Sequence, residues 1–184
     1  MSDLHQDISR VLISQAELDE ICDSLAARIS KDYPDAEREL ILVVILKGSV
    51  MFAADLCRRI TRLCNLEFMK VSSYGASTES TGFIQVQLDL TRDVTGADVL
   101  IVEDIVDSGR TLQKLMALLS SRGAHSVRCC ALLDKPERRM VELCADYVGK
   151  IIPDLFVVGY GLDYDQSYRN LPYVGVLKPS VYQK

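Results

Sequence analysis

The sequence has no apolar run long enough to cross a membrane. Its longest apolar stretch, residues 40–46, is far shorter than the ~20 residues that a spanning helix requires. The N-terminal segment also lacks the apolar region of a secretion signal, because residues 1–15 include Asp3, Asp7 and Arg10. We therefore expect a soluble, cytoplasmic protein with no membrane partner.

The sequence has no excess of positive charge either. It carries 21 Lys and Arg residues against 26 Asp and Glu residues, which gives a net charge of −5 and a pI near 5.1. This balance argues against a protein that binds nucleic acid through a broad basic surface. A small anionic ligand remains possible, because local backbone N–H groups and a metal ion can bind an anion in an acidic protein.

Cysteine motifs for metal or redox chemistry are absent. The six cysteines form no C-x-x-C pair, and no cysteine–histidine spacing suits zinc. We expect reduced and mostly buried thiols. Cys129 and Cys130 are adjacent in an expected strand, so their side chains should point to opposite faces. His5 and His125 match no motif and are expected on the surface.

The apolar periodicity divides the 184 residues into alternating strands and helices, a length that suits one domain. Residues 40–46 are apolar on both parities, which predicts a strand covered on both faces. Ser14 and Glu17 form an S-x-x-E capping box and predict a helix over 14–31. Helices are also expected over 50–63 and 111–121, and strands over 66–72, 83–88, 99–105 and 127–133, with short apolar pieces at 147–148, 156–158 and 173–177. This order predicts an α/β fold with a mostly parallel sheet.

The stretch VLIVEDIVDSGRTL, residues 99–112, combines a buried strand, three carboxylates and the start of a helix. Residues 107–111 offer a glycine, two hydroxyls and unpaired N–H groups, which favours phosphate binding. A simple N-cap by Asp107 or Ser108 is the alternative. Neither a Walker A loop nor G-x-G-x-x-G is present, so a dinucleotide is not expected.

Glu103 and Asp104 end the same strand. Such a pair could bind a ribose diol or a Mg²⁺ ion beside phosphates. The alternative is that both are solvated charges at the start of a loop with no ligand. Residues 47–49 and 134–135 also follow buried strands. Since ligands of open α/β sheets lie at the carboxyl ends of the strands, the three segments are expected to form one site.

At this point the sequence resembles the type I phosphoribosyltransferases, which use 5-phosphoribosyl-1-pyrophosphate. The resemblance lies in the signature of residues 99–112, in which an apolar strand is followed by two acidic residues, two apolar residues and then D-[ST]-G-x-T. Further matches resemble the hypoxanthine/guanine branch, in its compact bacterial-type form. They are LKGS at 46–49, SSYG at 72–75, LLDKPERR at 132–139 and IPDLFVVGYGLDYDQSYRNLPYVGVL at 152–177, so they run over most of the chain.

The resemblance implies a central, mostly parallel twisted sheet flanked by helices, with a small hood and a flexible lid loop. The chain would be a single domain, 1–184. Its core would cover about residues 38–145, and its hood the N-terminal segment with about residues 146–184. The lid loop would cover about residues 73–82, with Ser73 and Tyr74 closing over the reacting centre.

The resemblance also assigns roles to residues that would hold the phosphoribosyl donor. Ser108, Gly109, Arg110 and Thr111 would hold the 5′-phosphate with Asp107, mainly through backbone N–H groups. Glu103 and Asp104 would bind the ribose hydroxyls and help to organise Mg²⁺. Lys47 and Gly48 would form a pyrophosphate loop, often with a cis peptide before the lysine position. Arg169 would face pyrophosphate, and Asp163 would ligate a second Mg²⁺.

The remaining implied roles concern the base. Phe156 would stack on a purine, the Val157 backbone would meet its edge, and Lys135 would donate to its 6-oxo group. Asp107, near purine N7, would be the general base and acid. The implied reaction is purine salvage, which makes IMP, and probably GMP, from hypoxanthine and guanine with release of pyrophosphate.

Rival functions remain on the sequence alone. A nucleic-acid-binding regulator with the same fold is disfavoured, because the sequence shows no basic face and no helix-turn-helix extension. Lys135 and Phe156 disfavour adenine and pyrimidines, whereas xanthine stays open. Phe156 and Val157 could also be ordinary core, and the tyrosines at 160, 164, 168 and 173 are expected to pack rather than bind. The family implies a homodimer or homotetramer.

Overall fold

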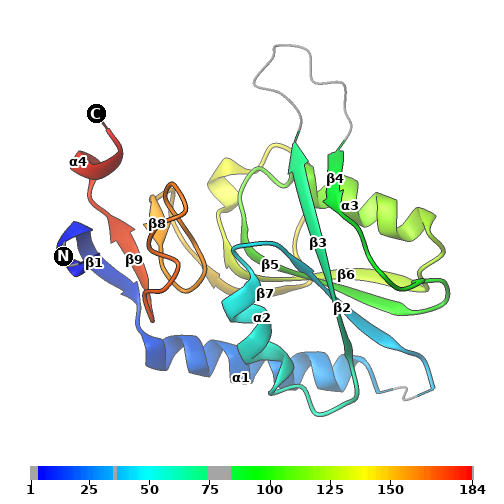
Figure 1. Cartoon of the computed structure of the whole chain (residues 1–184). Coiled ribbons are helices and arrows are strands. Elements are labelled where there is room, and N and C mark those ends of the chain that lie inside the picture. The colour runs from blue at the N-terminus through cyan, green and yellow to red at the C-terminus, as the bar shows by residue number, and fades with distance from the viewer. Residues whose placement is uncertain (1–3, 35–36, 74–83, 184) are drawn as a thin grey trace.

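A six-stranded sheet forms the centre of the computed structural model, which describes residues 4–34, 37–73 and 84–183 (Figure 1). Its strand order is β4-β3-β2-β5-β6-β7, and only β4 runs antiparallel to its neighbour. The strands are β2 (Leu40–Ile45), β3 (Asn65–Ser73), β4 (Ile84–Leu88), β5 (Asp98–Val106), β6 (Ser126–Asp134) and β7 (Tyr147–Ile151). The predicted α/β fold with a mostly parallel sheet is confirmed.

Both faces of this sheet are covered because its strands are apolar on both parities. Alternate residues of β2 point to opposite layers, with Leu40, Leu42 and Val44 on one side and Ile41 and Val43 on the other. Helices α1 (Gln15–Asp32) and α2 (Val50–Cys57) pack on the first face, and α3 (Arg110–Ser121) packs on the second. The sheet is therefore the middle layer of three (Figure 1).

Helix α1 begins at the predicted capping box. The Glu17 N–H donates to Ser14 Oγ at 3.3 Å, and the Ser14 N–H donates to Glu17 Oε2 at 2.8 Å. The two side chains thus satisfy N–H groups that the helix itself leaves unpaired. The prediction of a helix start at Ser14 is confirmed.

A second, three-stranded antiparallel sheet has the order β1-β9-β8 and forms a hood over one end of the large sheet (Figure 1). It joins the two ends of the described chain, because β1 (Ile8–Ile13) pairs with β9 (Val174–Leu177), which pairs with β8 (Val157–Val158). Short helices flank it at η1 (Leu4–Asp7) and α4 (Pro179–Tyr182). The carboxyl ends of β2, β5 and β6 face this hood.

Three local expectations differ from the structure. Strand β1 was not predicted, since five of its six residues are at least partly exposed and Val11 is 51% exposed. The core, predicted to end at about residue 145, extends further, because the large sheet includes β7. The helix predicted to reach residue 63 ends at Cys57, and Arg62 instead donates to the backbone oxygens of Tyr33 and Arg38 at 2.8 and 2.6 Å.

The cysteines are less buried than expected: Cys22, Cys129 and Cys130 are buried, Cys57 and Cys64 are partly exposed, and Cys144 is exposed. Cys129 and Cys130 are buried on opposite faces of the large sheet, and all six thiols are free. In the part of the chain that the structure describes, no helix is long and apolar enough to cross a bilayer. The predicted lid falls outside the described residues, except for the backbone of Ser73 at the end of β3.

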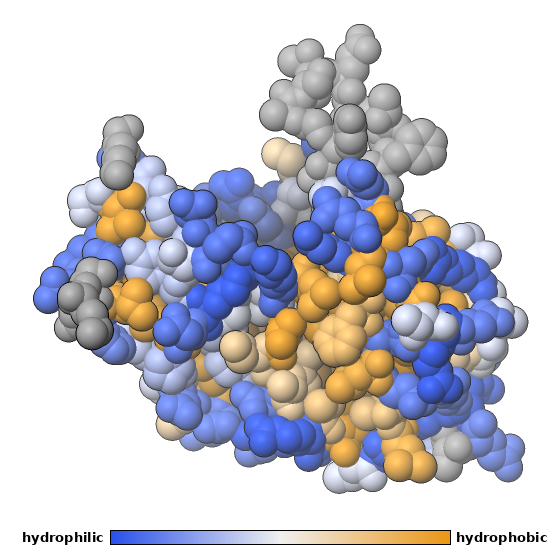
Figure 2. Space-filling view, viewed as in Figure 1, coloured by the Kyte–Doolittle hydropathy of each residue, from blue (hydrophilic) through white to orange (hydrophobic). Residues whose placement is uncertain are grey.

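Apolar side chains gather over β3 and α2 on the face shown in Figure 2. These elements expose Met51, Leu66 and Phe68 by 43, 41 and 40%. An exposed apolar area of this kind is typical of a contact surface for another protein.

Candidate functional site

The loop between β5 and α3 presents a helix N-terminus that no side chain caps. Gly109 is the N-cap, in the left-handed region at φ 78°, so neither Asp107 nor Ser108 is the cap. A Cβ at this glycine would also lie 3.0 Å from both Arg139 Cδ and Val141 Cγ2. The hydrogen bond that closes the first turn of α3 runs from the Gln113 N–H to the Gly109 oxygen, at 2.9 Å. The preceding N–H groups and the helix dipole are available to an anion.

A pocket of about 130 Å³ opens at this helix end. Its walls combine the end of β5, the loop and the first turn of α3: Glu103, Ile105, Val106, Asp107, Ser108, Gly109, Thr111 and Leu112. The Arg110 side chain is exposed and does not line it. The pocket therefore offers N–H groups and hydroxyls rather than a cationic side chain.

A larger pocket, of about 270 Å³, lies beside the first and shares Ile105 and Asp107 with it. The other residues that line it come from β5, β6 and the hood: Asp104, Lys135, Phe156, Val157, Leu162 and Asp163. Residues as far apart in the chain as Asp104 and Asp163 meet here. They come from the carboxyl ends of β5 and β6 and from the hood. Asp107 lies at the boundary of the two pockets.

Glu103 and Asp104 open toward different pockets, as adjacent residues of a strand should. Burial raises the pKa of Glu103 well above its usual value, and the Asp104 charge raises it further. Burial also raises the pKa of Asp104 to about 6, against the effect of backbone N–H donors and Arg169. Two carboxylates with raised pKa values favour a ligand that brings hydroxyl groups or a cation.

The loop after β2 holds Asp104 in place. The Leu46–Lys47 peptide bond is cis, as the resemblance implies. Ser49 is completely buried, and its Oγ accepts the Asp104 N–H at 3.1 Å, where the ladder between β2 and β5 has ended. A Cβ at Gly48 would lie 1.5 Å from Asp104 Oδ2, so only glycine lets the two segments approach.

Two cationic side chains meet at Gln166. Lys47 Nζ donates to Gln166 Oε1 at 3.0 Å, and Arg169 Nη2 lies 3.5 Å from the same oxygen. Arg169 also pairs with Asp163 at 2.8 Å and donates to the Gly161 oxygen at 2.6 Å. Lys47 and Arg169 are 122 positions apart in the sequence, yet they meet at Gln166, and the Arg169 charge also acts on the Asp104 carboxylate. This arrangement suits a second, strongly anionic group.

Lys135 also lines the larger pocket. It is only 8% exposed, and its Nζ donates to the Leu155 oxygen at 2.7 Å and lies 3.4 Å from Asp154 Oδ1. An ammonium group has three N–H donors, so one remains for a ligand. Phe156 is 38% exposed and offers an aromatic surface next to this donor.

Two arginines that sequence reasoning did not select hold the loop at Asp107. Arg138 Nε donates to Asp107 Oδ1 at 2.7 Å, and Arg139 Nη1 donates to the Asp107 backbone oxygen at 2.6 Å. Arg139 also pairs with Asp134 at the end of β6. Gln166, Asp154 and Ser49 were likewise missed as partners of site residues. No spacing in the sequence identifies them, because each acts through a contact across the fold.

Ten of the predicted site residues line the two pockets. They are Glu103, Asp104, Asp107, Ser108, Gly109, Thr111, Lys135, Phe156, Val157 and Asp163. Lys47, Gly48 and Arg169 lie beside them through the contacts above. Arg110 points away, Tyr74 lies outside the described residues, and only the backbone of Ser73 is described.

No three His, Cys, Asp or Glu side chains form a metal cluster in residues 4–34, 37–73 and 84–183. The carboxylates at 103, 104 and 163 are nevertheless the hard oxygen donors that Mg²⁺ prefers. Mg²⁺ is usually bound by one or two carboxylates together with substrate phosphates. The donor set therefore fits an ion that arrives with an anionic substrate.

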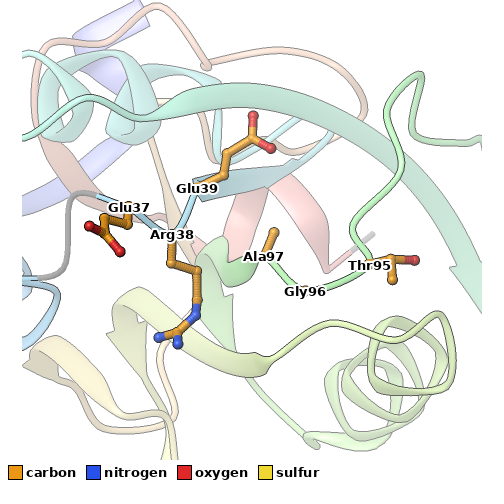
Figure 3. Close-up of a pocket in the computed structure, with 6 residues that line it drawn as sticks. All are labelled: Glu37, Arg38, Glu39, Thr95, Gly96 and Ala97. Carbon is orange, nitrogen blue, oxygen red and sulfur yellow. The ribbon is translucent and has the colours of Figure 1, made fainter.

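A further pocket, of about 380 Å³, lies at the opposite ends of β2 and β5 (Figure 3). Its charged groups are already engaged, because Glu39 pairs with Arg92 at 2.6 Å and Arg38 lies 3.7 Å from Asp98. Figure 3 shows the Arg38 and Glu39 side chains pointing in opposite directions. Since ligands of open α/β sheets bind at the carboxyl ends, the paired pockets are the better candidate.

Comparison with known proteins agrees with this geometry. The family model of the phosphoribosyl transferase domain matches residues 12–165. A hypoxanthine-guanine phosphoribosyltransferase of Staphylococcus epidermidis is 51% identical over 98% of this chain and 100% of its own length. One from Staphylococcus aureus is 50% identical over 97% of this chain and 99% of its own.

Solved structures show the same fold. A hypoxanthine phosphoribosyltransferase of Staphylococcus aureus covers 100% of both chains with a TM-score of 0.94 and 49% identity. The enzyme of Trypanosoma cruzi, solved as a ternary substrates complex, covers 96% of this chain and 99% of its own with a TM-score of 0.91 and 40% identity. A family model matching most of the chain, with full-length relatives near 50% identity, shows that this chain belongs to the phosphoribosyltransferase family.

Proposed function

We propose that this phosphoribosyltransferase moves the 5-phosphoribosyl group from its 1-pyrophosphate to N9 of hypoxanthine and guanine, with IMP, GMP and pyrophosphate as products. The observation that carries the proposal is the pair of adjoining pockets that share Asp107. One pocket is suited to a phosphate and the other to a flat, oxo-bearing base. The names of the staphylococcal relatives support the same substrates.

The base half of the site selects a 6-oxopurine. The Lys135 ammonium lies in the larger pocket beside Phe156, so a base stacked on that ring would receive a hydrogen bond at its 6-oxo group. Adenine carries a 6-amino group, which would set a donor against a donor. Val157, in strand β8, offers backbone groups to the edge of the base. Lys135 therefore disfavours adenine. It does not discriminate between xanthine and guanine, which both carry a 6-oxo group, so the substrate assay below compares them.

The donor half of the site holds the 5′-phosphate at the start of α3. Ser108 and Thr111 supply hydroxyls, and the loop N–H groups supply the remaining donors. Glu103 and Asp104 accept hydrogen bonds from the ribose hydroxyls. Lys47 and Arg169, joined at Gln166, neutralise the pyrophosphate. The uncharged donors thus serve the phosphate, and the cations serve the leaving group.

Mg²⁺ would complete this half of the site: Glu103 and Asp104 would help to hold one ion, and Asp163 would ligate a second. When bound, the metal neutralises charge on the pyrophosphate oxygens. The raised pKa values of Glu103 and Asp104 support a cation beside them, since a positive charge favours the ionised carboxylates.

The chemical step follows from these positions. Base N9 attacks the ribose carbon, the bond to pyrophosphate breaks, and the leaving oxygen keeps the electron pair. The sugar passes through an oxocarbenium-like state. Lys47 and Arg169 stabilise the charge that develops on the leaving group. Asp107 takes the proton from purine N7, after exchanging its bond with Arg138 for one to the base.

The experiment is a steady-state assay with hypoxanthine, guanine, xanthine and adenine, each at saturating phosphoribosyl pyrophosphate and Mg²⁺. We expect turnover of hypoxanthine and guanine and essentially none of adenine. Lys135→Met keeps the length of the side chain but removes its donors. It should lower kcat/KM for the 6-oxopurines by about 10- to 100-fold, the worth of a hydrogen bond to a charged group. Turnover of adenine alone would refute the role of Lys135.

We further propose that the enzyme is a cytoplasmic homodimer or homotetramer. The apolar surface over β3 and α2 supports an oligomer (Figure 2), because these elements expose the large apolar side chains Met51, Leu66 and Phe68. Six free thiols support a reducing compartment. Sedimentation of the purified protein measures the oligomer, and a monomer at micromolar concentration would contradict it.

A further inference from the structure

Three aromatic rings form a cluster at the outer side of the larger pocket. The rings of Phe156 and Tyr182 are stacked, with centroids 4.6 Å apart and planes at 21°. Tyr164 meets the Phe156 ring edge-on at 5.7 Å and 84°, and lies 6.4 Å from Tyr182. Phe156 is therefore held on one face and at one edge by residues from two other parts of the hood.

The two faces of the Phe156 ring have different neighbours. Phe156 lines the larger pocket together with Ile105 and Lys135, whereas Tyr182 is not among the residues that line it. Because an aromatic ring has only two faces and Tyr182 covers one from outside the pocket, the other face is left for the pocket. A base would thus lie between Phe156 and the β5 side chain Ile105.

Tyr182 is fixed to the hood rather than carried on a free tail. Helix α4 follows Lys178, whose N–H donates to the Asp7 oxygen at 2.9 Å and whose Nζ donates to the Gln6 oxygen. Val181 and Tyr182 pack against the apolar cluster that contains Val158 and Leu177. The N-terminal segment, β9 and α4 therefore act together to place the Tyr182 ring.

We propose that Tyr182 is a positioning residue for purine binding: its ring stacks on the outer face of Phe156 and holds that side chain in the orientation that receives the base. This inference rests on the proposed function, because it takes the larger pocket as the base site. Phe156 is 38% exposed and precedes a strand of only two residues, so its neighbours rather than its own strand restrict its rotation. Tyr182 supplies the only stacked ring contact to Phe156 within the described part of the chain.

The test compares wild type with Tyr182→Ala and Tyr182→Phe. KM for hypoxanthine and for phosphoribosyl pyrophosphate is measured separately, and GMP affinity is measured by calorimetry. Tyr182→Ala should raise the hypoxanthine KM and weaken GMP binding by about 3- to 10-fold, the worth of one aromatic pair, with a much smaller change in the phosphoribosyl pyrophosphate KM. Tyr182→Phe keeps the ring and should restore the wild-type base KM.

The outcomes separate this inference from the proposed function. An unchanged hypoxanthine KM in Tyr182→Ala would overturn it, and so would a parallel rise of both KM values with a lowered melting temperature, which indicates a structural role only. Failure of Tyr182→Phe to restore the base KM would also overturn it. If wild type uses no 6-oxopurine, the proposed function fails first.

Discussion

Replacing Gly48 by alanine tests how closely the loop after β2 approaches Asp104. The added Cβ would lie 1.5 Å from Asp104 Oδ2 and 2.6 Å from its Cγ, where ordinary contact begins at 3.4 Å. The carboxylate must therefore move by about 2 Å, taking the difference between these distances. Because Asp104 is only partly buried, it has room to rotate, and the chain should stay folded at a cost of about 1–3 kcal/mol.

The displacement of the Asp104 carboxylate should lower the catalytic rate more than the stability of the protein. A misplacement of ~1 Å in an active site lowers the rate by about 10²-fold. We therefore expect kcat/KM for phosphoribosyl pyrophosphate to fall by at least about 10²-fold in Gly48→Ala. The assay is steady-state turnover of hypoxanthine with phosphoribosyl pyrophosphate varied, alongside thermal unfolding of the same samples.

Gly96→Ala is the matched control. Gly96 has φ 74°, and nothing lies within 4 Å of a Cβ built there, at the far end of the sheet. The variant should lose a similar ~1–3 kcal/mol through backbone strain but keep full activity. In an Asp104→Ala background, Gly48→Ala should add little, because the clashing carboxylate is gone. Gly48→Ala activity within about threefold of the Gly96→Ala value would refute the reasoning.

Two further predictions concern Asp107 and Glu17. Asp107→Asn should lower kcat by on the order of 10²-fold or more with a smaller effect on substrate binding; near-normal turnover would remove Asp107 as the general base. The hydrogen bonds from Ser14 lower the pKa of Glu17 from 4.5 to about 2, so its contribution to stability is complete above pH 4.5 and is lost as the pH falls toward 2. In Glu17→Gln, the free energy of unfolding should depend less steeply on pH between these values, as measured by urea titration at each pH; an unchanged slope would contradict this assignment.

The elements that the sequence predicts well depend on local patterns. The buried strand at 40–46, the capping box at Ser14 and the glycine-containing turn before α3 all follow from neighbours within a few residues. The residues that line the two pockets also come mainly from motifs at the ends of predicted strands. Strand β1 escaped prediction because its pairing with β9 is made across the whole length of the chain and its residues alternate weakly.

The sequence by itself therefore determined the α/β class and the parallel sheet, because strand burial and helix starts are local properties, and its motifs predicted most of the residues that line the two pockets. Only the tertiary structure decided how those residues are held. The joining of Lys47 and Arg169 at Gln166, the grip of Arg138 on Asp107 and the stacking of Tyr182 on Phe156 each depend on contacts between distant segments. No periodicity or spacing encodes such contacts, since each forms only when the fold brings segments that are distant in the sequence together.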